Sequence, residues 1–478
     1  MDGDAFLRNL TPMLSRAGGQ TLVDDTNLSL TGIELLQHIS ALKEMLRPRL
    51  QPGDVVAVAL RSSVAYLVLQ AALVDLGAVF VGVPTDAPYL LDDVRTRCEP
   101  RWYALAPGSE FAEAARSDAG LLLVDERTAS VSVAWAPRER SGVSDLADGR
   151  VVAATSGSTG QPKLVVLSPE SYWFAATSIG RVTGIRASDS VLHHLPIQRG
   201  AGWLLWGSVA AGAHNLILPT RTTELPNALR DNSITATFSV SVGLAEMVKQ
   251  DYSAESLPDL RTLYYSSGPV TVDLKRALAE RFGDRLIQDY GMTEVPEPVT
   301  VLTREDHVRG LDNPTLLSSV GKPLHPNRIS VESGAGPSEP GGIRVRSPYM
   351  FEGYWGQPLQ TVERWYDTGD LGYFDTEGGL HIVGRRSESV RSGGVSFSLN
   401  DIRSHIMSVQ GVEDVDLSVL PDDRLGERVR ASVVVSAGSG LDAGSLTDHL
   451  RSVVEDSRAI PSEIHLSTTA TSFEERNH

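Results

Sequence analysis

Apolar runs alternate with helical patterns along most of the chain. Residues 55–60 predict a buried strand, residues 62–76 predict a helix, and residues 78–84 predict a second strand. The same strand-like pattern returns at residues 121–126 and 215–220. Because strands that alternate with helices form parallel sheets covered by helices, the pattern predicts a layered α/β fold.

The pattern changes near Arg385. A strand-like stretch ends there, and residues 387–398 are rich in Ser and Gly, which is typical of a hinge. The elements predicted beyond it are helices at 399–407 and 446–454 and strands at 415–420 and 430–435. These features predict a large N-terminal domain of layered sheets and helices, residues 1–385, and a small mobile α+β C-terminal lid domain, residues 386–478.

Composition narrows the class of protein. In the 478 residues, 43 Lys and Arg stand against 60 Asp and Glu, which gives a net charge of -17. Such a surface repels phosphate backbones and anionic lipid, so no nucleic-acid or membrane partner is expected. The single cysteine, Cys98, excludes an intrachain disulfide and fits a reducing cytosol. No apolar signal segment opens the chain, so a cytoplasmic location is expected.

The strongest chemical signal is the segment TSGSTGQPK at residues 155–163, which directly follows an apolar strand-like run. It supplies hydroxyl groups, flexible glycines and one cation, carried by Thr155, Ser156, Gly157, Ser158, Thr159, Gly160 and Lys163. Free backbone amides with these groups predict a cradle for a polyphosphate. It is not the Walker pattern, because Gln161 and Pro162 separate the last glycine from the lysine. The structural alternative is a flexible Ser/Gly turn.

Further motifs follow this loop in order. They are YGMTE at 290–294, YDTGD at 366–370, Gly384–Arg385 and the glycine segment 392–394, with weaker matches at 320–323 and 353–355. Together they resemble the signatures of the adenylate-forming superfamily, which contains acyl-CoA synthetases, peptide-synthetase adenylation domains and luciferases. The resemblance spans about residues 25–470.

The resemblance implies ATP and Mg²⁺ as cofactors, with coenzyme A as a candidate acceptor. Beyond the phosphate loop, the implied nucleotide-binding residues are Ser267, Gly268, Pro269, Asp289, Tyr290, Gly291, Met292, Asp370 and Arg385. Tyr290 would stack on adenine, and Asp370 would accept hydrogen bonds from both ribose hydroxyls. Taken singly, Tyr290 also fits a core residue and Asp370 a turn cap.

The same resemblance implies the catalytic residues. Thr293 would hold the α-phosphate, Glu294 would bind Mg²⁺, and Lys163 would stabilise charge on the phosphates. Arg199 stands where the family usually has His or an aromatic residue, so it is a candidate for binding an anionic substrate group. A structural salt bridge is the alternative for Arg199.

One family residue is missing. The family's C-terminal domain, which rotates about a hinge near Ser387, normally brings a lysine to the acid and the α-phosphate. Here that position is Asn477, or Arg476 with a slip of one residue, and all five lysines precede the hinge. Three interpretations follow: Arg476 replaces the lysine, the enzyme uses another route or an unusual acid, or the protein is a non-catalytic nucleotide-binding module.

The implied function is an ATP-dependent ligase that activates a small acid, an aryl or acyl carboxylate, as its AMP ester and releases pyrophosphate. The activated group then passes to a thiol or an amine. Some family members adenylate nitrite for reaction with an aromatic amine, and this diazotase-type reaction is an alternative. The sequence names neither the acid nor the acceptor, and it does not fix the oligomeric state.

Overall fold

The computed structural model describes most of the chain. The described residues are 10–14, 19–109, 111, 119–137, 149–155, 162–268, 270–332, 340–360, 363–386, 389–392, 395–422, 425–436, 438–454 and 457–468. They divide into two compact units. The first comprises Met1–Ile329, Val345–Tyr366 and Thr376–Leu380, and the second comprises Ser330–Arg344, Asp367–Asp375 and His381–His478.

A nine-stranded sheet forms one layer of the first unit. Its spatial order is β16 (Lys322–Pro323), β15 (Val295–Leu302), β14 (Leu286–Met292), β13 (Thr262–Tyr265), β12 (Ala236–Ser239), β10 (Ser190–His193), β11 (His214–Ile217), β1 (Thr21–Asp25) and β2 (Ser29–Thr31). The strands from β14 to β1 are parallel, and the two edges are antiparallel. A parallel centre brings the carboxyl ends of several strands to one edge, where ligands bind in open α/β sheets.

An eight-stranded sheet forms the other layer. Its spatial order is β19 (Gly353–Tyr354), β9 (Lys163–Leu167), β8 (Val151–Thr155), β4 (Val79–Gly82), β3 (Val55–Ala59), β5 (Trp102–Leu105), β6 (Gly120–Asp125) and β7 (Ser130–Trp135). Strands β3, β4 and β5 are buried along their whole length. They are continuous apolar runs because both faces of a parallel sheet are covered.

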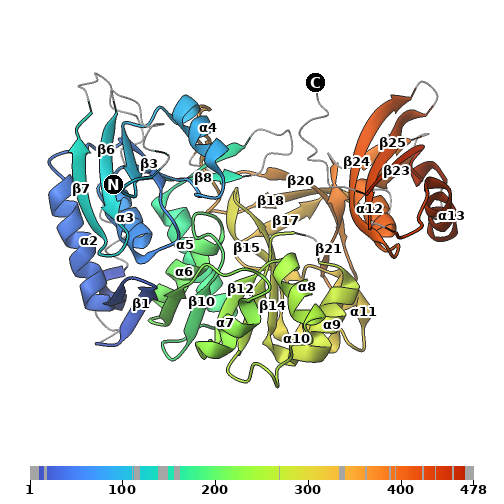
Figure 1. Cartoon of the computed structure of the whole chain (residues 1–478), viewed down its shortest axis with the longest axis horizontal. Helices are drawn as coiled ribbons and strands as arrows, with labels where there is room; N and C mark the ends of the chain where they lie inside the picture. The colour runs from blue at the N-terminus through green and yellow to red at the C-terminus, as the bar shows by residue number, and fades with distance from the viewer. Residues whose placement is uncertain are drawn as a thin grey trace. The chain divides into compact units, whose positions relative to one another are not determined.

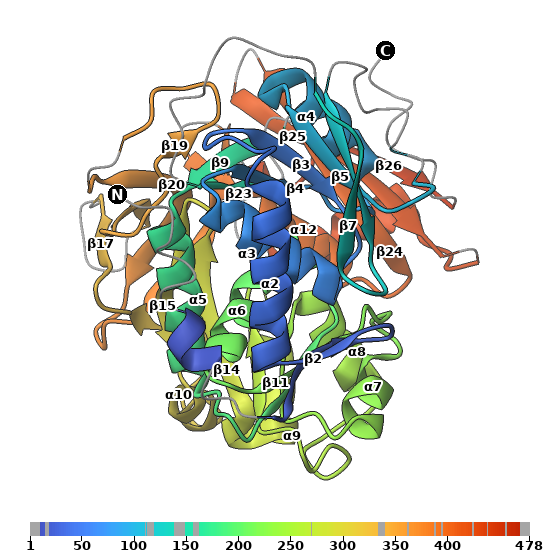
Figure 2. The ribbon, with the colours of Figure 1, turned by 90° about the vertical axis from the view of Figure 1, so that its left-hand side faces the viewer.

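Helices fill the space between the sheets and cover their outer faces. The helices of the first unit are α2 (Gly32–Leu46), α3 (Val64–Asp75), α4 (Pro88–Cys98), α5 (Pro169–Thr183), α6 (Ala201–Ala210), α7 (Leu225–Asp231), α8 (Ser241–Lys249), α9 (Val272–Phe282), α10 (Arg304–Arg309) and α11 (Pro314–Ser318). In Figure 1, α5 and α6 lie between the strands of the two sheets. Figure 2 shows α2 on the outside of the same unit, where it packs on α3.

Helix α3 is buried at every residue. A helix that is apolar on all sides belongs between two layers, as its sequence VAYLVLQAALVD indicates. The Ser63 hydroxyl begins it by accepting a hydrogen bond from the Tyr66 amide. None of the described helices is long and apolar enough to cross a lipid bilayer.

The second unit contains its own sheets. Most residues of a four-stranded sheet with the order β17 (Arg328–Val331), β18 (Gly341–Arg346), β20 (Tyr366–Phe374) and β21 (Leu380–Arg385) belong to it. A five-stranded sheet contains β22 (Ser389–Ser392), β23 (Val395–Ser398), β24 (Val412–Asp422), β25 (Gly426–Val435) and β26 (Glu463–Ser467), with helices α12 (Leu399–Met407) and α13 (Ala443–Val453). These helices and strands enclose a separate apolar core.

The structure confirms the predicted α/β class, and the mixed architecture agrees with the predicted layers. Helix 399–407 coincides with α12, while the strand predicted at 215–220 ends at Ile217 because Pro219 cannot donate to a sheet. The Ser- and Gly-rich stretch after Arg385 contains strands β22 and β23, which pair with each other. Cys98 is buried, as a small apolar residue would be. The predicted domain boundary at residue 385 stays a prediction.

Candidate active site

A β-hairpin carries the residues on both sides of the predicted phosphate loop. Strands β8 and β9 pair antiparallel, with Thr155 opposite Lys163. The Thr155 hydroxyl donates to the Lys163 carbonyl over 3.5 Å. The chain therefore leaves and re-enters the sheet at one point. The remaining loop positions Ser156, Gly157, Ser158, Thr159 and Gly160, together with Pro269, Ser387, Arg476 and Asn477, lie outside the described residues.

Tyr354 connects the hairpin with Glu294. Its hydroxyl donates to Glu294 Oε1 over 2.8 Å, and its ring centroid lies 5.4 Å from the Lys163 ammonium. The Tyr366 hydroxyl lies 3.1 Å from the Tyr354 hydroxyl. Because Tyr354 donates its single proton to Glu294, Tyr366 is the donor in this second hydrogen bond. Burial raises the pKa of Tyr354 to about 12, so the hydroxyl stays protonated at neutral pH. One aromatic side chain thus fixes a cation and a carboxylate.

The turn between β14 and β15 presents Thr293 and Glu294. Met292 pairs with Val295, so these two residues are the whole turn. On the neighbouring strand, β13, the backbone leaves the sheet through Ser267 and Gly268, with φ of 66° and 129°. A side chain is rare at such φ values, and a Cβ added at Gly268 would meet nothing closer than 3.9 Å. Space for a ligand is therefore open in front of this backbone.

A cavity of about 360 Å³ lies beside these strand ends. Its lining reaches from Thr155 on β8 to Ser267 after β13 and to Gly291, Met292 and Thr293 on β14 and its turn. Most of its wall is apolar or aromatic, with Phe80, Ile179, Trp203, Phe238 and Tyr264 among the lining residues. Pockets for small ligands have this character, with a few polar groups that orient the ligand.

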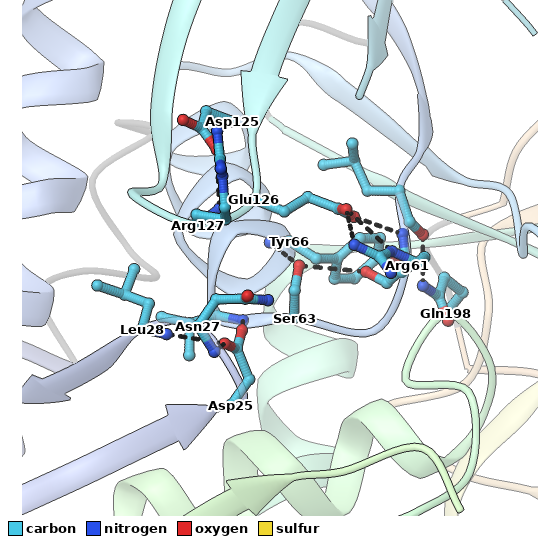
Figure 3. A network of polar contacts seen from close by, with 12 residues as sticks. Asp25, Asn27, Leu28, Arg61, Ser63, Tyr66, Asp125, Glu126, Arg127 and Gln198 are labelled. Atoms are coloured by element: carbon cyan, nitrogen blue, oxygen red, sulfur yellow. Dashed lines mark hydrogen bonds and ion pairs between the residues drawn. The ribbon is translucent and has the colours of Figure 1, made fainter. Parts of the chain in front are cut away.

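Gln198 and Arg199 enter the cavity lining from the segment before α6. The Gln198 amide donates to the Leu60 carbonyl over 2.8 Å, so the loop between β3 and α3 holds it in place. Figure 3 shows this loop, in which the guanidinium of Arg61 faces Glu126 and pairs with it at 2.8 Å. The polar wall of the cavity is thus anchored to the eight-stranded sheet.

Arg199 lies at the cavity and pairs with Asp86 at 3.5 Å. The two side chains are 53% and 58% exposed. A pair as exposed as this contributes at most about 1 kcal/mol, so it leaves the guanidinium able to exchange partners. Both interpretations of Arg199 therefore persist: it has a structural partner, and it faces the cavity.

Asp289 is the most deeply buried charged group of the cavity lining, with 8% of its surface exposed. The Tyr264 hydroxyl interacts with its carboxylate, and the Ser266 hydroxyl donates to its backbone carbonyl over 3.2 Å. Its Oδ1 has no donor among the described residues. Burial is the largest effect on this group and raises its pKa to about 6. The sequence assigned Asp289 only to the nucleotide set and gave no sign of the unpaired oxygen.

Tyr290 is half-buried on β14, where it pairs with Thr300 of β15. Among the described residues, no three His, Cys, Asp or Glu side chains gather at a point where a metal ion would be enclosed. An ion at Glu294 would then need further ligands from a phosphate, which is how Mg²⁺ is usually held.

Asp370 and Arg385 belong to the second unit, on β20 and β21. Arg385 Nε donates to Asp370 Oδ1 over 3.2 Å. The Thr368 hydroxyl accepts from the Asp370 amide at 3.0 Å and donates to the Ile343 carbonyl at 2.9 Å. The structure therefore brings the two predicted ribose-site residues into contact with each other.

The chain is similar to known proteins along most of its length. The family model described as AMP-binding enzyme matches residues 14–355. A 2-succinylbenzoate–CoA ligase of Geobacillus kaustophilus is 27% identical over 441 residues, which cover 89% of this chain and 86% of that protein. A feruloyl-CoA synthase of Amycolatopsis sp is 29% identical over 455 residues, covering 90% and 89%. The crystal structure of ATP-bound MatB from Rhodopseudomonas palustris shares the fold, with a TM-score of 0.81, 24% identity and coverage of 98% and 95%.

Proposed function

This chain belongs to the AMP-binding enzymes, a family of adenylate-forming ligases, and from that premise we propose that it activates an aryl or acyl carboxylate as its AMP ester and transfers the acyl group to a thiol or an amine. The contacts of Tyr354 are the main support for this proposal. Tyr354 joins Lys163 of the phosphate-loop hairpin to Glu294 of the β14–β15 turn, beside a cavity of about 360 Å³. This arrangement provides a cation, a carboxylate and a substrate pocket together.

In the proposed reaction a carboxylate oxygen of the acid attacks the α-phosphorus of ATP. The new bond joins that oxygen to phosphorus, and the bond to the β-phosphate oxygen breaks, so pyrophosphate leaves with the electron pair. Lys163 would stabilise the charge that builds on the phosphates, and the Thr293 hydroxyl would donate to the α-phosphate. Lys163 begins β9 opposite Thr155, and Thr293 lies in the two-residue turn between β14 and β15, which supports these roles.

Glu294 fits the binding of Mg²⁺. It is the carboxylate that directly follows Thr293, a residue of the cavity lining, and Tyr354 fixes its Oε1 by a 2.8 Å hydrogen bond. A hard cation prefers such an oxygen together with phosphate oxygens, and when bound it would neutralise charge on the leaving pyrophosphate. Tyr354 is in this scheme a positioning residue, because it acts through Glu294.

The nucleotide base would lie between Tyr290 and the backbone of Ser267 and Gly268. The open space in front of Gly268 supports this assignment, since a planar base needs close approach to the backbone. Asp370 and Arg385, in the second unit, remain predicted ribose-site residues. The 3.2 Å pair between Arg385 and Asp370 keeps these two residues together, which supports a shared role.

The acid would occupy the apolar cavity, whose size suits a single aromatic ring or a short acyl chain. The acyl group would then pass from the adenylate to a sulfur or nitrogen nucleophile, and AMP would leave. Relatives named as CoA ligases, 27% and 29% identical, support a thiol such as coenzyme A as the first acceptor to test.

The test is ATP–pyrophosphate exchange over a panel of aryl and acyl carboxylates, with nitrite as one member. We expect exchange with at least one carboxylate, and AMP release that requires both this acid and a thiol or amine. Exchange with nitrite alone would replace the proposal with the diazotase-type reaction. Tight ATP binding without exchange or AMP release for any acid would contradict it.

A further inference from the structure

Three hydrogen bonds hold the segment before α6 to the loop before α3. The Gln198 side-chain amide donates to the Leu60 carbonyl over 2.8 Å, and its oxygen accepts from the Ser62 hydroxyl over 3.3 Å. The same hydroxyl accepts from the Ile197 main-chain amide over 3.1 Å. The loop follows β3 of the eight-stranded sheet, and the segment follows β10 of the nine-stranded sheet. These bonds therefore join the two sheets beside the cavity.

Glu126 fixes the backbone of this loop at Arg61, the residue between the two that contact Gln198. Its Oε1 accepts from the Arg61 main-chain amide over 2.8 Å, and its Oε2 accepts from Arg61 Nε and Nη2 over 3.0 and 2.8 Å. Glu126 is 6% exposed, whereas the Arg61 side chain is 70% exposed. Figure 3 shows Glu126 and Gln198 bonded to neighbouring residues of the loop. A buried carboxylate with both oxygens bonded is a rigid attachment for that loop.

The attached segment supplies four successive residues of the cavity lining, Ile197, Gln198, Arg199 and Gly200. Gln198 is held at both its amide nitrogen and its amide oxygen, so the loop sets its orientation. The guanidinium of Arg199 pairs with Asp86 at 3.5 Å, but both side chains are more than half exposed, and such a pair holds a side chain weakly. The place of Arg199 at the cavity therefore depends on the attachment of the two residues before it.

We propose that Glu126 is a positioning residue: acting through Arg61, it holds residues 197–200 in place for the acid. This inference rests on the proposed function, because it takes the acid to occupy the cavity. Glu126 is not among the described residues that line the cavity, so its effect reaches the acid through the polypeptide and not by contact. A binding group that shifts by a fraction of an ångström loses much of its effect, because the bound orientation is lost.

A second buried carboxylate holds the opposite end of β3. Asp54, directly before that strand, is 7% exposed and accepts from the Gln51 amide over 2.9 Å and from Arg101 over 3.2 Å. It matches Glu126 in burial, in its arginine partner and in its bond to a main-chain amide. About 20 Å of extended chain separates Asp54 from Leu60, and Asp54 is not among the described lining residues. It is therefore the matched control.

Glu126→Gln tests the assignment with little change of shape. Gln has one acceptor oxygen where Glu has two, so it can serve the main-chain amide or the guanidinium of Arg61 but not both. In pyrophosphate exchange with the best acid of the panel, kcat/KM for the acid should fall about 10- to 100-fold, mainly through KM. The KM for ATP should change less than twofold. Asp54→Asn should lower the melting temperature and keep the wild-type KM for the acid.

Arg61→Ala is a second variant, at a side chain exposed enough for the fold to tolerate the change. It removes the guanidinium but keeps the bond from the main-chain amide to Glu126. The KM for the acid should therefore rise about threefold, which is less than in Glu126→Gln, and the KM for ATP should again stay constant.

Hydrogen–deuterium exchange measures the attachment without turnover. The Ile197 amide donates to Ser62, so peptides that contain residues 196–203 should take up deuterium about tenfold faster in Glu126→Gln than in the wild type. The same peptides of Asp54→Asn should exchange at the wild-type rate.

The outcomes separate the two proposals. A normal KM for the acid in Glu126→Gln and Arg61→Ala, or an equal rise of that KM in Asp54→Asn, overturns this inference and leaves the proposed function intact. A wild-type protein that shows neither pyrophosphate exchange nor binding with any carboxylate overturns both.

Discussion

Buried polar groups lie at both faces of strands β13 and β14, and the two faces differ in how completely these groups are hydrogen-bonded. On one face, Tyr264 and Asp289 border the cavity, and Asp289 Oδ1 lacks a donor among the described residues. On the other face, the Tyr265 hydroxyl lies 2.8 Å from His307 Nε2, and His307 Nδ1 lies 2.7 Å from the Thr303 carbonyl. Because a carbonyl only accepts, Nδ1 carries the proton and Tyr265 donates to Nε2.

The difference follows from what each face meets. The second face packs against helices of the same unit, and Lys275 of α9 donates there to the Ser319 carbonyl at 2.9 Å. Its network is closed by protein atoms and stabilises the fold. The first face meets a cavity, and its network is left open. A closed buried network makes the fold rigid, whereas an open one leaves a buried acceptor unpaired at a cost in stability.

The largest effect is expected at the cavity end of β14. Glu294→Gln should lower pyrophosphate exchange by about 10²- to 10³-fold, because the neutral amide binds a cation poorly, and it should raise the Mg²⁺ concentration needed for half-maximal activity. Glu305→Gln on the surface of α10 is the control and should retain activity. An equal loss in both variants, or normal Mg²⁺ dependence in Glu294→Gln, would contradict the assignment.

The second prediction concerns the pH dependence of stability that Lys275 causes on the closed face. Burial lowers the pKa of Lys275 to about 7, below its value of 10.5 in an unfolded chain. Between these values the unfolded chain binds the extra proton, so stability rises with pH. The free energy of unfolding should increase by about 3 kcal/mol more from pH 7 to pH 9.5 in the wild type than in Lys275→Met. Urea unfolding at several pH values measures it, and parallel profiles would refute it.

The third prediction concerns the hydrogen bond between Tyr265 and His307 in the closed network. Tyr265→Phe should lower the free energy of unfolding by about 1–3 kcal/mol, because it leaves the buried Nε2 of His307 without a donor. Activity should remain within about twofold after correction for the folded fraction. Urea unfolding and pyrophosphate exchange on the same preparation give both values. A specific loss of activity with unchanged stability would mean that the two faces are not independent.

The smallest effect is expected at Tyr354. Tyr354→Phe removes the 2.8 Å hydrogen bond to Glu294 but keeps the ring beside Lys163. It should raise the Mg²⁺ requirement about tenfold or less, with stability changed by about 1 kcal/mol. A Mg²⁺ titration of activity distinguishes this role from a packing role, which would change stability without moving the titration.

The sequence predicted the parts of the site that depend on local pattern. The phosphate-loop ends at Thr155 and Lys163 are found opposite each other, and YGMTE forms the β14–β15 turn region. What it missed depends on distant residues. The unpaired oxygen of Asp289 is set by which groups β13 presents beside it, and the Tyr354–Glu294 contact joins residues 60 positions apart. Strand β26 was also missed, because its pairing partner β25 decides it.

The burial of helix α3 limits which substitutions can change the substrate of this enzyme. Tyr66 and Gln70 line the cavity from a helix without an exposed residue, and the Gln70 side chain also forms hydrogen bonds with Tyr172 and Trp206. A substitution at Tyr66 or Gln70 disturbs the packing of both sheets. Most such variants will therefore unfold, whatever their effect on substrate choice. Arg199 lines the same cavity with a side chain that is 53% exposed, so a change there disturbs less of the fold. Evolution and engineering will therefore reach a new acid more easily through Arg199 than through α3.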